Sequence, residues 1–245
     1  MRPSSPDLSA APSAPPLAPA PAGDEWQFAF APYLWLAGLD GQIGLGGRTA
    51  DVDLDFGDIL ENLDVGLMGA FEARKGRWIL DFDSLWLRLK TRTDYDGLFY
   101  NTARSRVEEV RLQAMLGYRV LEGPTSIDLL AGASYFYLDN ELRLGGGPLD
   151  ELKLGSSEDW CDPVVAVALK HRFGERWFAT GRGMIGGFGV GSDLTWQVVA
   201  ALGYRLSEHF SVLGGYRHLA IDYQSGDFLY DAATSGFILG VGIEW

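Results

Sequence analysis

Cysteine is almost absent from this 245-residue sequence, which also lacks long apolar runs and an excess of basic residues. A single thiol cannot form an internal disulfide or supply several ligands to a zinc site. The longest purely apolar run, residues 164–169, is far shorter than the roughly 20 residues of a membrane-spanning helix. With 20 basic and 33 acidic residues, the net charge of -13 argues against binding nucleic acid through its phosphates.

The residues that are present exclude a disordered chain, because 47% are hydrophobic and 13% are aromatic. The mean hydropathy of +0.00 is typical of a soluble protein. A transmembrane β-barrel would give the same mean, because its strands alternate apolar and polar residues. Composition alone therefore leaves both classes open.

The first 25 residues differ from the rest, since seven of the eleven prolines lie there among alanine and serine. This composition predicts an extended, unpacked tail. No run of about 7 apolar residues in the segment forms the core of a secretory signal peptide. Residues 26–245 are predicted to form one domain.

From Trp26 onward the dominant period is two, which indicates β-strands. Four tight turns, at residues 75–78, 121–124, 173–177 and 206–210, alternate with looser connections at 93–105, 145–150 and 155–159. Ten strands are predicted, at residues 26–39, 65–74, 78–91, 106–120, 126–144, 162–173, 177–190, 194–206, 210–224 and 228–245. Residues 42–56 are expected to form a hairpin or excursion, and 58–63 a short helix or a plug-like turn. Full-length strands in 42–56 would raise the count to twelve, and an eight-stranded barrel is the other alternative.

The last strand places Phe237, Leu239, Val241, Ile243 and Trp245 on one face, and small or polar residues mostly on the other. This strand resembles the C-terminal strand of Gram-negative outer-membrane β-barrel proteins, which ends in Phe or Trp and is read by the barrel-assembly machinery. The resemblance covers residues 26–245 as a pattern. It implies a closed antiparallel up-and-down transmembrane barrel in the outer membrane, surrounded by bilayer and lipopolysaccharide. The missing signal peptide departs from that family.

Alternation in other strands agrees with this assignment of faces. In residues 109–119, Leu112, Leu116 and Tyr118 alternate with Arg111, Gln113 and Arg119. A register shift of one residue would expose the arginines to lipid, at about 2–4 kcal/mol each near the bilayer centre. Aromatic residues near the strand ends predict two girdles. The first comprises Trp78, Tyr118, Trp177, Tyr204, Phe210 and Trp245, and the second Trp35, Trp86, Tyr135, Tyr137 and Trp196.

Charged residues of both signs fall on the inward positions of these strands. The predicted lumen network comprises Glu72, Asp81, Asp83, Glu109, Arg111, Arg119, Asp128, Lys170, Arg172, Arg182, Arg205 and Arg217, with Arg74 and Glu244 beside them. A barrel of eight to ten strands has a narrow interior that side chains fill. The network is therefore expected to be a salt-bridged filling of a structural barrel. A narrow porin-like passage for small solutes, with arginines that set ion preference, is the alternative.

Other functions remain as competing hypotheses. A barrel enzyme acting on lipid or peptide would need a site built from His171, His209 or His218, the last with Asp222 and Ser225 on the same strand. A triad also needs partners from other strands. We therefore expect no catalysis and no cofactor. We also expect no metal site, since the acidic stretches at 51–64 and 150–162 match no calcium loop and are expected to lie in loops. A soluble ligand-binding β-barrel or sandwich is the third hypothesis.

Overall fold

The computed structural model describes residues 25–45, 48–94, 100–147 and 150–245. Its elements are β1 (Trp26–Leu45), β2 (Arg48–Leu54), α1 (Phe56–Glu61), β3 (Leu63–Lys75), β4 (Trp78–Asp94), β5 (Thr102–Leu121), β6 (Thr125–Gly145), β7 (Leu152–Phe173), β8 (Trp177–Gly187), β9 (Leu194–Arg205), β10 (Phe210–Ser225) and β11 (Phe228–Glu244). The predicted tail lies almost wholly outside the described residues. No helix in the described ranges is long and apolar enough to cross a membrane.

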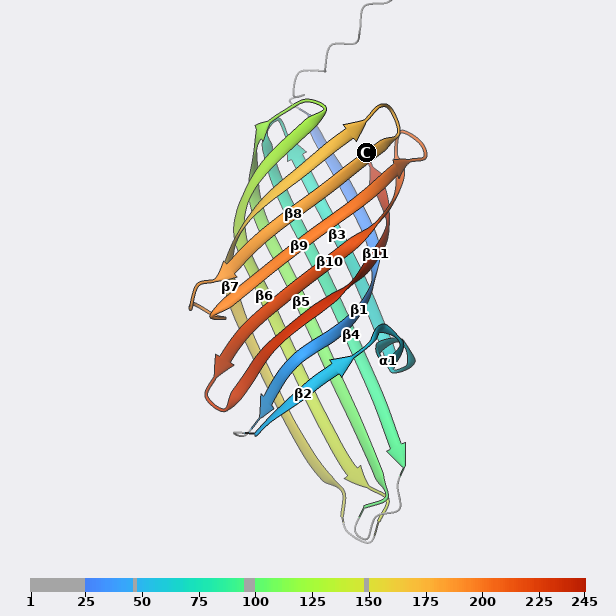
Figure 1. The fold of residues 1–245 in the computed structure, drawn as a ribbon, viewed down its shortest axis with the longest axis vertical. Coiled ribbons are helices and arrows are strands. Elements are labelled where there is room, and N and C mark those ends of the chain that lie inside the picture. The colour runs from blue at the N-terminus through green and yellow to red at the C-terminus, as the bar shows by residue number, and fades with distance from the viewer. Residues whose placement is uncertain (1–24, 46–47, 95–99, 148–149) are drawn as a thin grey trace, which may run out of the picture.

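Ten antiparallel strands form a closed up-and-down barrel (Figure 1). Each strand from β3 to β11 pairs with its neighbour in sequence, and β1 pairs with both β3 and β11 to close the ring. The closure needs close backbone contact, because a Cβ added at Gly236 would lie 2.1 Å from the Leu36 carbonyl oxygen. We call the end with Trp26 and Trp245 the near rim and the opposite end the far rim.

The eleventh strand, β2, lies outside the closed ring. β1 pairs with β3 only from Trp26 to Pro32, and from Leu39 onward it pairs with β2 instead. Among the described residues, the intervening stretch 33–38 has a ladder partner only in β11. Pro32 has no backbone N–H, which suits a position where a ladder ends. The predicted excursion at 42–56 is therefore a hairpin that borders a seam between β1 and β3.

Helix α1 follows β2 and begins with reciprocal caps between Asp55 and Asp58. None of its residues is buried, so it is the predicted short helix and does not plug the lumen.

The barrel wall is uneven in height (Figure 1). Strands β5, β6 and β7 have 20, 21 and 22 residues, whereas β8 and β9 have 11 and 12. The difference of about ten residues is roughly 30 Å along a strand. The prediction that 155–159 is a loop was wrong, because β7 begins at Leu152. The prediction that 188–190 continues a strand was also wrong, because β8 ends at Gly187.

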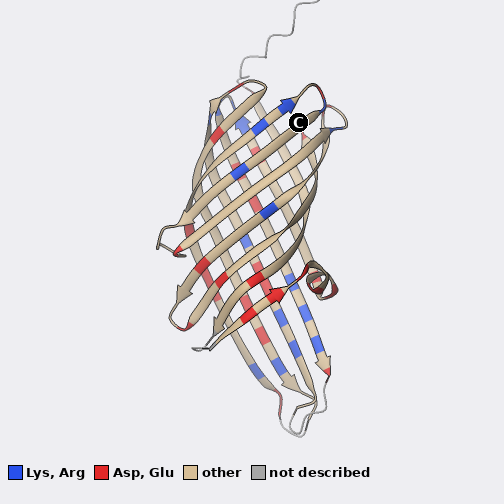
Figure 2. Ribbon diagram, viewed as in Figure 1, with Lys and Arg blue, Asp and Glu red and all other residues tan. Residues whose placement is uncertain are grey.

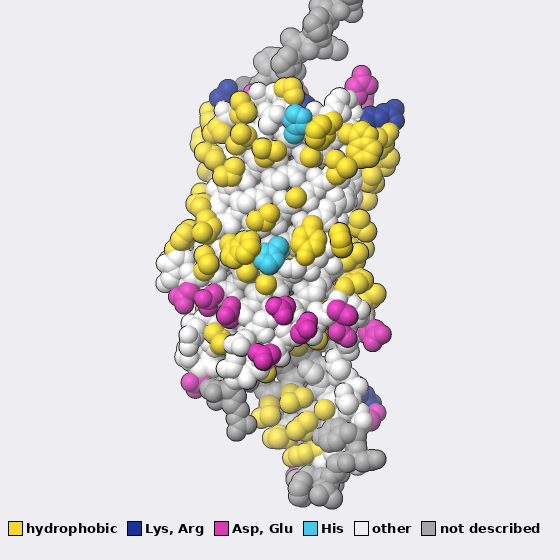
Figure 3. Space-filling model, viewed as in Figure 1, with side chains coloured by type: hydrophobic (Ala, Val, Ile, Leu, Met, Phe, Trp, Pro, Cys, Tyr) yellow, Lys and Arg dark blue, Asp and Glu magenta, His cyan; other side chains and the backbone are white. Residues whose placement is uncertain are grey.

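The two faces of the strands are confirmed over most of the barrel. On β5, Leu112 and Leu116 are each 51% exposed, whereas Arg111 is 2% exposed. Near-rim aromatics pair edge to face on the outside, as in Trp78 with Tyr118, at 5.1 Å between ring centroids. Figure 3 shows apolar side chains over the near-rim half of the visible face, followed by an acidic band. We use the name acidic band for five exposed aspartates that the strand register brings together on β1, β2, β10 and β11: Asp40, Asp51, Asp53, Asp222 and Asp231.

One girdle assignment is corrected. Trp35 points into the barrel and is 7% exposed, because the inward positions of β1 are Tyr33, Trp35 and Ala37. Its neighbour Leu34 points outward and is 60% exposed. The four other residues of the predicted second girdle stay partly accessible on the outward face.

Candidate functional site in the lumen

The near-rim part of the lumen is a charged vestibule of about 760 Å³. Alternating inward positions of neighbouring strands bring opposite charges together there. Arg119 on β5 makes two hydrogen bonds to Asp128 on β6, at 2.7 and 2.9 Å. Across the lumen, Arg182 on β8 donates two to Asp81 on β4, at 2.9 and 2.5 Å. Both pairs are bidentate, and the second joins strands that are 101 residues apart in the sequence.

Weaker contacts continue the vestibule toward the near rim. Lys170 lies 3.8 Å from Glu244, and Arg172 donates to the Gly123 carbonyl oxygen at 3.1 Å. Arg74 bonds Glu72 at 2.6 Å. The side chains of both signs around the cavity resemble a hydrated, mixed-charge surface more than a selective binding site.

A buried polar layer, centred on Asp83 and Arg217, lies in the lumen beyond the vestibule. Arg217 is 4% exposed and donates to Gln197 Oε1 at 2.9 and 2.6 Å, to Tyr33 Oη at 2.7 Å and to Asp83 Oδ1 at 3.1 Å. The Tyr33 hydroxyl in turn donates to Asp83 at 2.9 Å. Arg111 lies 3.7 Å from the same carboxylate.

Arg111 is held less well than Arg217. Neither of its terminal nitrogens has a hydrogen-bond partner among the described residues. Its guanidinium lies over the Trp35 ring, 5.6 Å from the centroid, and 6.0 Å from that of Phe136. Two arginines therefore share one carboxylate, and only one of them is fully satisfied.

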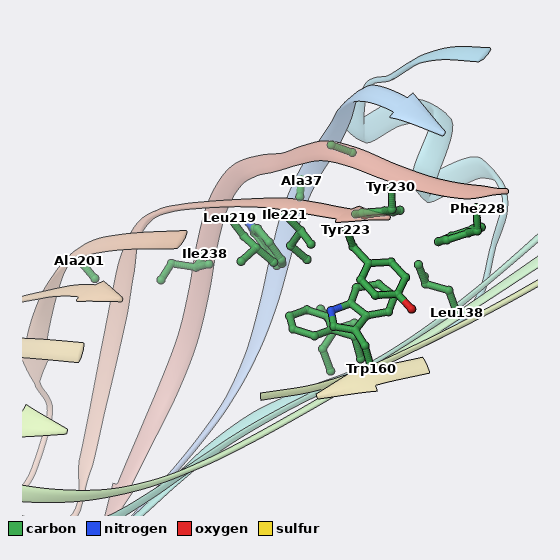
Figure 4. Close-up of a cluster of buried hydrophobic side chains, with 14 residues drawn as sticks. Ala37, Leu138, Trp160, Ala201, Leu219, Ile221, Tyr223, Phe228, Tyr230 and Ile238 are labelled. Atoms are coloured by element: carbon green, nitrogen blue, oxygen red, sulfur yellow. The ribbon is translucent and has the colours of Figure 1, made fainter. Parts of the chain in front are cut away.

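An apolar layer fills the lumen on the far side of this polar layer (Figure 4). Trp160 of β7 stacks on Tyr223 of β10 at 4.0 Å between centroids and on Phe136 of β6 at 5.2 Å. Strands β7 and β10 are not neighbours in the sheet, so this contact crosses the interior. Phe228 and Tyr230 of β11 belong to the same buried cluster. Two successive layers of different chemistry therefore occupy the lumen.

Comparisons with known proteins give a fold. No protein-family model and no curated protein matches the chain. The outer-membrane protease OmpT of Escherichia coli superposes with a TM-score of 0.61 at 12% identity, over 91% of this chain and 97% of that one. The chain has the outer-membrane β-barrel fold. Matches with lower scores include the translocator domain of the autotransporter NalP from Neisseria meningitidis (TM-score 0.43, 15% identity, 89% of this chain and 88% of that one). Ail from Yersinia pestis is another (TM-score 0.32, 12% identity, 90% and 98%).

Within this outer-membrane β-barrel fold, most of the predicted lumen residues fall into the vestibule or the polar layer. Arg205 lines the vestibule. Glu109 forms no ion pair with any described residue, although it precedes Arg111 by two positions on β5. Sequence reasoning gave no role to Tyr33 or to Gln197, although Gln197 falls on the lumen face of its strand by alternation, and it missed the apolar layer. Both are uncharged polar residues on inward positions, whereas the predicted network contained charged residues alone.

Six acidic residues that were expected in loops lie in strands instead: Asp51 and Asp53 in β2, Asp64 in β3, and Glu158, Asp159 and Asp162 in β7. Asp162 belongs to β7, is fully buried, and accepts hydrogen bonds from the Ser192 backbone at 2.7 Å, the Ser192 hydroxyl at 2.7 Å and the Thr195 hydroxyl at 2.8 Å. It therefore ties the connection between β8 and β9 to the barrel wall.

The histidines do not form a catalytic constellation with the carboxylates of the described ranges. His218 bonds the Ser235 hydroxyl at 2.6 Å, and its ring lies 4.6 Å from that of Trp196 on the outward surface. His171 contacts Thr125 at 2.7 Å near the near rim. The described residues also contain no group of three or more His, Cys, Asp or Glu placed to hold a metal ion.

Proposed function

We propose that the chain is an integral outer-membrane protein with a closed lumen, which serves as a structural barrel rather than as an open porin. The observation that favours closure is the contact between Trp160 and Tyr223, which lie on non-neighbouring strands and stack at 4.0 Å. Because the polar layer around Arg217 lies behind it, a solute would have to displace both layers.

Membrane placement is supported by the outward surface. Phe237, Leu67 and Leu34 are 65%, 60% and 60% exposed, and many other large apolar side chains on the same face are similarly open. A belt of this kind is costly in water and favourable in lipid. The near-rim aromatics border it, as expected at a lipid headgroup boundary.

Detergent dependence tests the placement. The full chain is expected to require detergent or lipid to stay monomeric, and to migrate differently on gels before and after heating. A folded monomer in plain buffer would refute membrane placement and favour a soluble β-barrel.

Planar-bilayer conductance tests closure. The refolded protein is expected to give no stable conductance steps. A narrow passage is the second candidate, because the vestibule of about 760 Å³ already opens one end of the lumen. Regular steps whose ion preference changes when Arg111 or Arg182 is replaced would favour that candidate and contradict closure.

A further inference from the structure

The outward face of β4–β7, on the far-rim side of Trp86, presents basic residues directly opposite one another. Arg92 pairs with Arg104, Arg104 with Arg143, and Arg143 with Lys153. We call these residues the four-cation row. With strands about 4.8 Å apart, the row extends roughly 14 Å across the sheet. Like charges in direct cross-strand register destabilise a sheet, so this arrangement favours a bound anion.

Nearby acids neutralise the row incompletely. Asp94, Glu141 and Glu151 each contact a cation two residues away in the sequence, mostly at exposed positions. Such exposed pairs contribute little and leave the cations available. Arg104 forms no ion pair with a described residue. Hydrogen bonds from the Thr102 hydroxyl and from Arg92 hold the pKa of Asp94 below its usual value, so Asp94 stays ionised at neutral pH.

A groove of about 360 Å³ follows this surface. Besides Thr91 and Ser105, its lining residues are charged: Lys90, Arg92, Arg104, Arg106, Arg143 and Glu141. Arg106 adds a buried Nε that has no hydrogen-bond partner among the described residues. Lys90 pairs with Asp64 at 2.9 Å and Arg106 with Glu108 at 2.5 Å. Among the described residues, Arg104 is therefore the lining cation without an ion pair, and it lies beside the unsatisfied Nε of Arg106.

The position of the row relative to the apolar belt indicates which anion it meets. Arg92 follows Trp86 by six residues on the same face of β4, which is roughly 15 Å beyond the girdle for a strand tilted by about 40°. Figure 2 shows basic positions gathered on these projecting strand ends. The row faces outward, away from the lumen, at the level of groups that project from the membrane surface.

We propose that the four-cation row binds phosphate groups of a membrane glycolipid of the lipopolysaccharide type. Arginine binds phosphate through two parallel hydrogen bonds, and a row of three arginines matches an anion with several phosphates. Anchoring in the same membrane raises the effective concentration of the glycolipid at the groove. This inference rests on the proposed outer-membrane placement. The competing occupant is a second copy of the chain, whose acidic band has the opposite charge.

The test compares Arg104→Gln/Arg143→Gln with Arg77→Gln/Arg176→Gln, which removes the same charge from exposed near-rim turns. Heat-modifiable, folded protein in detergent micelles is titrated with lipopolysaccharide that has a phosphorylated core, and with the same lipid after chemical removal of its phosphates. The first variant is expected to bind the phosphorylated lipid about 10- to 100-fold more weakly than the wild type. The near-rim variant is expected to bind like the wild type, and Arg104→Lys to retain part of the affinity.

Four outcomes would overturn the proposal. Equal affinities of the two double variants would do so, as would equal binding of native and dephosphorylated lipid. Binding of inorganic tripolyphosphate through Arg104 without discrimination between the two lipids would assign the groove to a soluble polyanion. Lipid-free dimers that dissociate in the Arg104→Gln/Arg143→Gln variant would assign it to a second copy. Protein that folds without detergent refutes the membrane placement instead, and is distinguished before any titration.

Discussion

Replacing Arg217 with methionine is expected to destabilise the barrel far more than the same change at Arg111, although both arginines are buried beside Asp83. Arg217 makes four hydrogen bonds, including one of 3.1 Å to the carboxylate. Its loss leaves Gln197, Tyr33 and Asp83 short of a donor, and removal of one partner from a buried pair costs about 3–5 kcal/mol.

The expected cost at Arg111 is much smaller. Its attraction to Asp83 at 3.7 Å is about 4 kcal/mol at an effective dielectric constant of about 20. Its two terminal nitrogens have no hydrogen-bond partner in the described ranges, and each such buried donor costs about 1–3 kcal/mol. Methionine removes both effects and leaves one arginine for one carboxylate. Arg111→Met should therefore stay within about 1 kcal/mol of the wild type.

Equilibrium unfolding in urea, with the protein in phospholipid vesicles and followed by tryptophan fluorescence, measures both free energies. Arg176→Met at the exposed near rim serves as control, with an expected change of at most about 0.5 kcal/mol. Equal losses of about 3 kcal/mol or more for Arg217→Met and Arg111→Met would refute the asymmetry, and with it the assignment of the satisfied and unsatisfied arginine.

Three further predictions concern closure, assembly and backbone approach. Trp160→Ala/Tyr223→Ala is expected to give conductance steps in planar bilayers that the wild type lacks, at a cost of about 3–5 kcal/mol or more in stability; a silent, folded variant would show that the polar layer alone seals the lumen. Deleting Trp245 should lower the amount of heat-modifiable barrel in membranes of expressing cells, and normal assembly would remove its role as signal. Gly236→Ala should destabilise by about 1–3 kcal/mol, since the new methyl group meets backbone, whereas Gly183→Ala meets nothing within 4 Å and should be neutral in the same unfolding assay.

The strand pattern could be predicted from sequence wherever one face meets lipid and the other is polar. On β5 the alternation of Leu112 with Arg111 determines which side chains point toward lipid, and therefore also the register of the strand. Leu34, Trp35 and Leu36 are consecutive apolar residues, so no polar side chain marks which face of this strand points into the lumen. Trp35 was therefore assigned to the wrong face.

The remaining errors have a different physical origin. Residues 155–159 of β7 lie in the projecting wall, where neither face has to be apolar, so the alternation that marks a strand is weak. The apolar layer depends on contact between Trp160 and Tyr223, which are 63 positions apart in the printed sequence and on strands that do not pair. Such a contact follows from the cross-section of the closed barrel and from no local pattern.

The seam between β1 and β3 makes the first strand mechanically unequal along its length. Residues 33–38 are held by one hydrogen-bonded ladder, whereas the segments on either side are held by two. Local opening requires less free energy where fewer backbone hydrogen bonds must break. Amide hydrogens of this stretch should exchange with solvent deuterium sooner than those of β5 or β6, so that the first strand opens from its middle rather than from its ends.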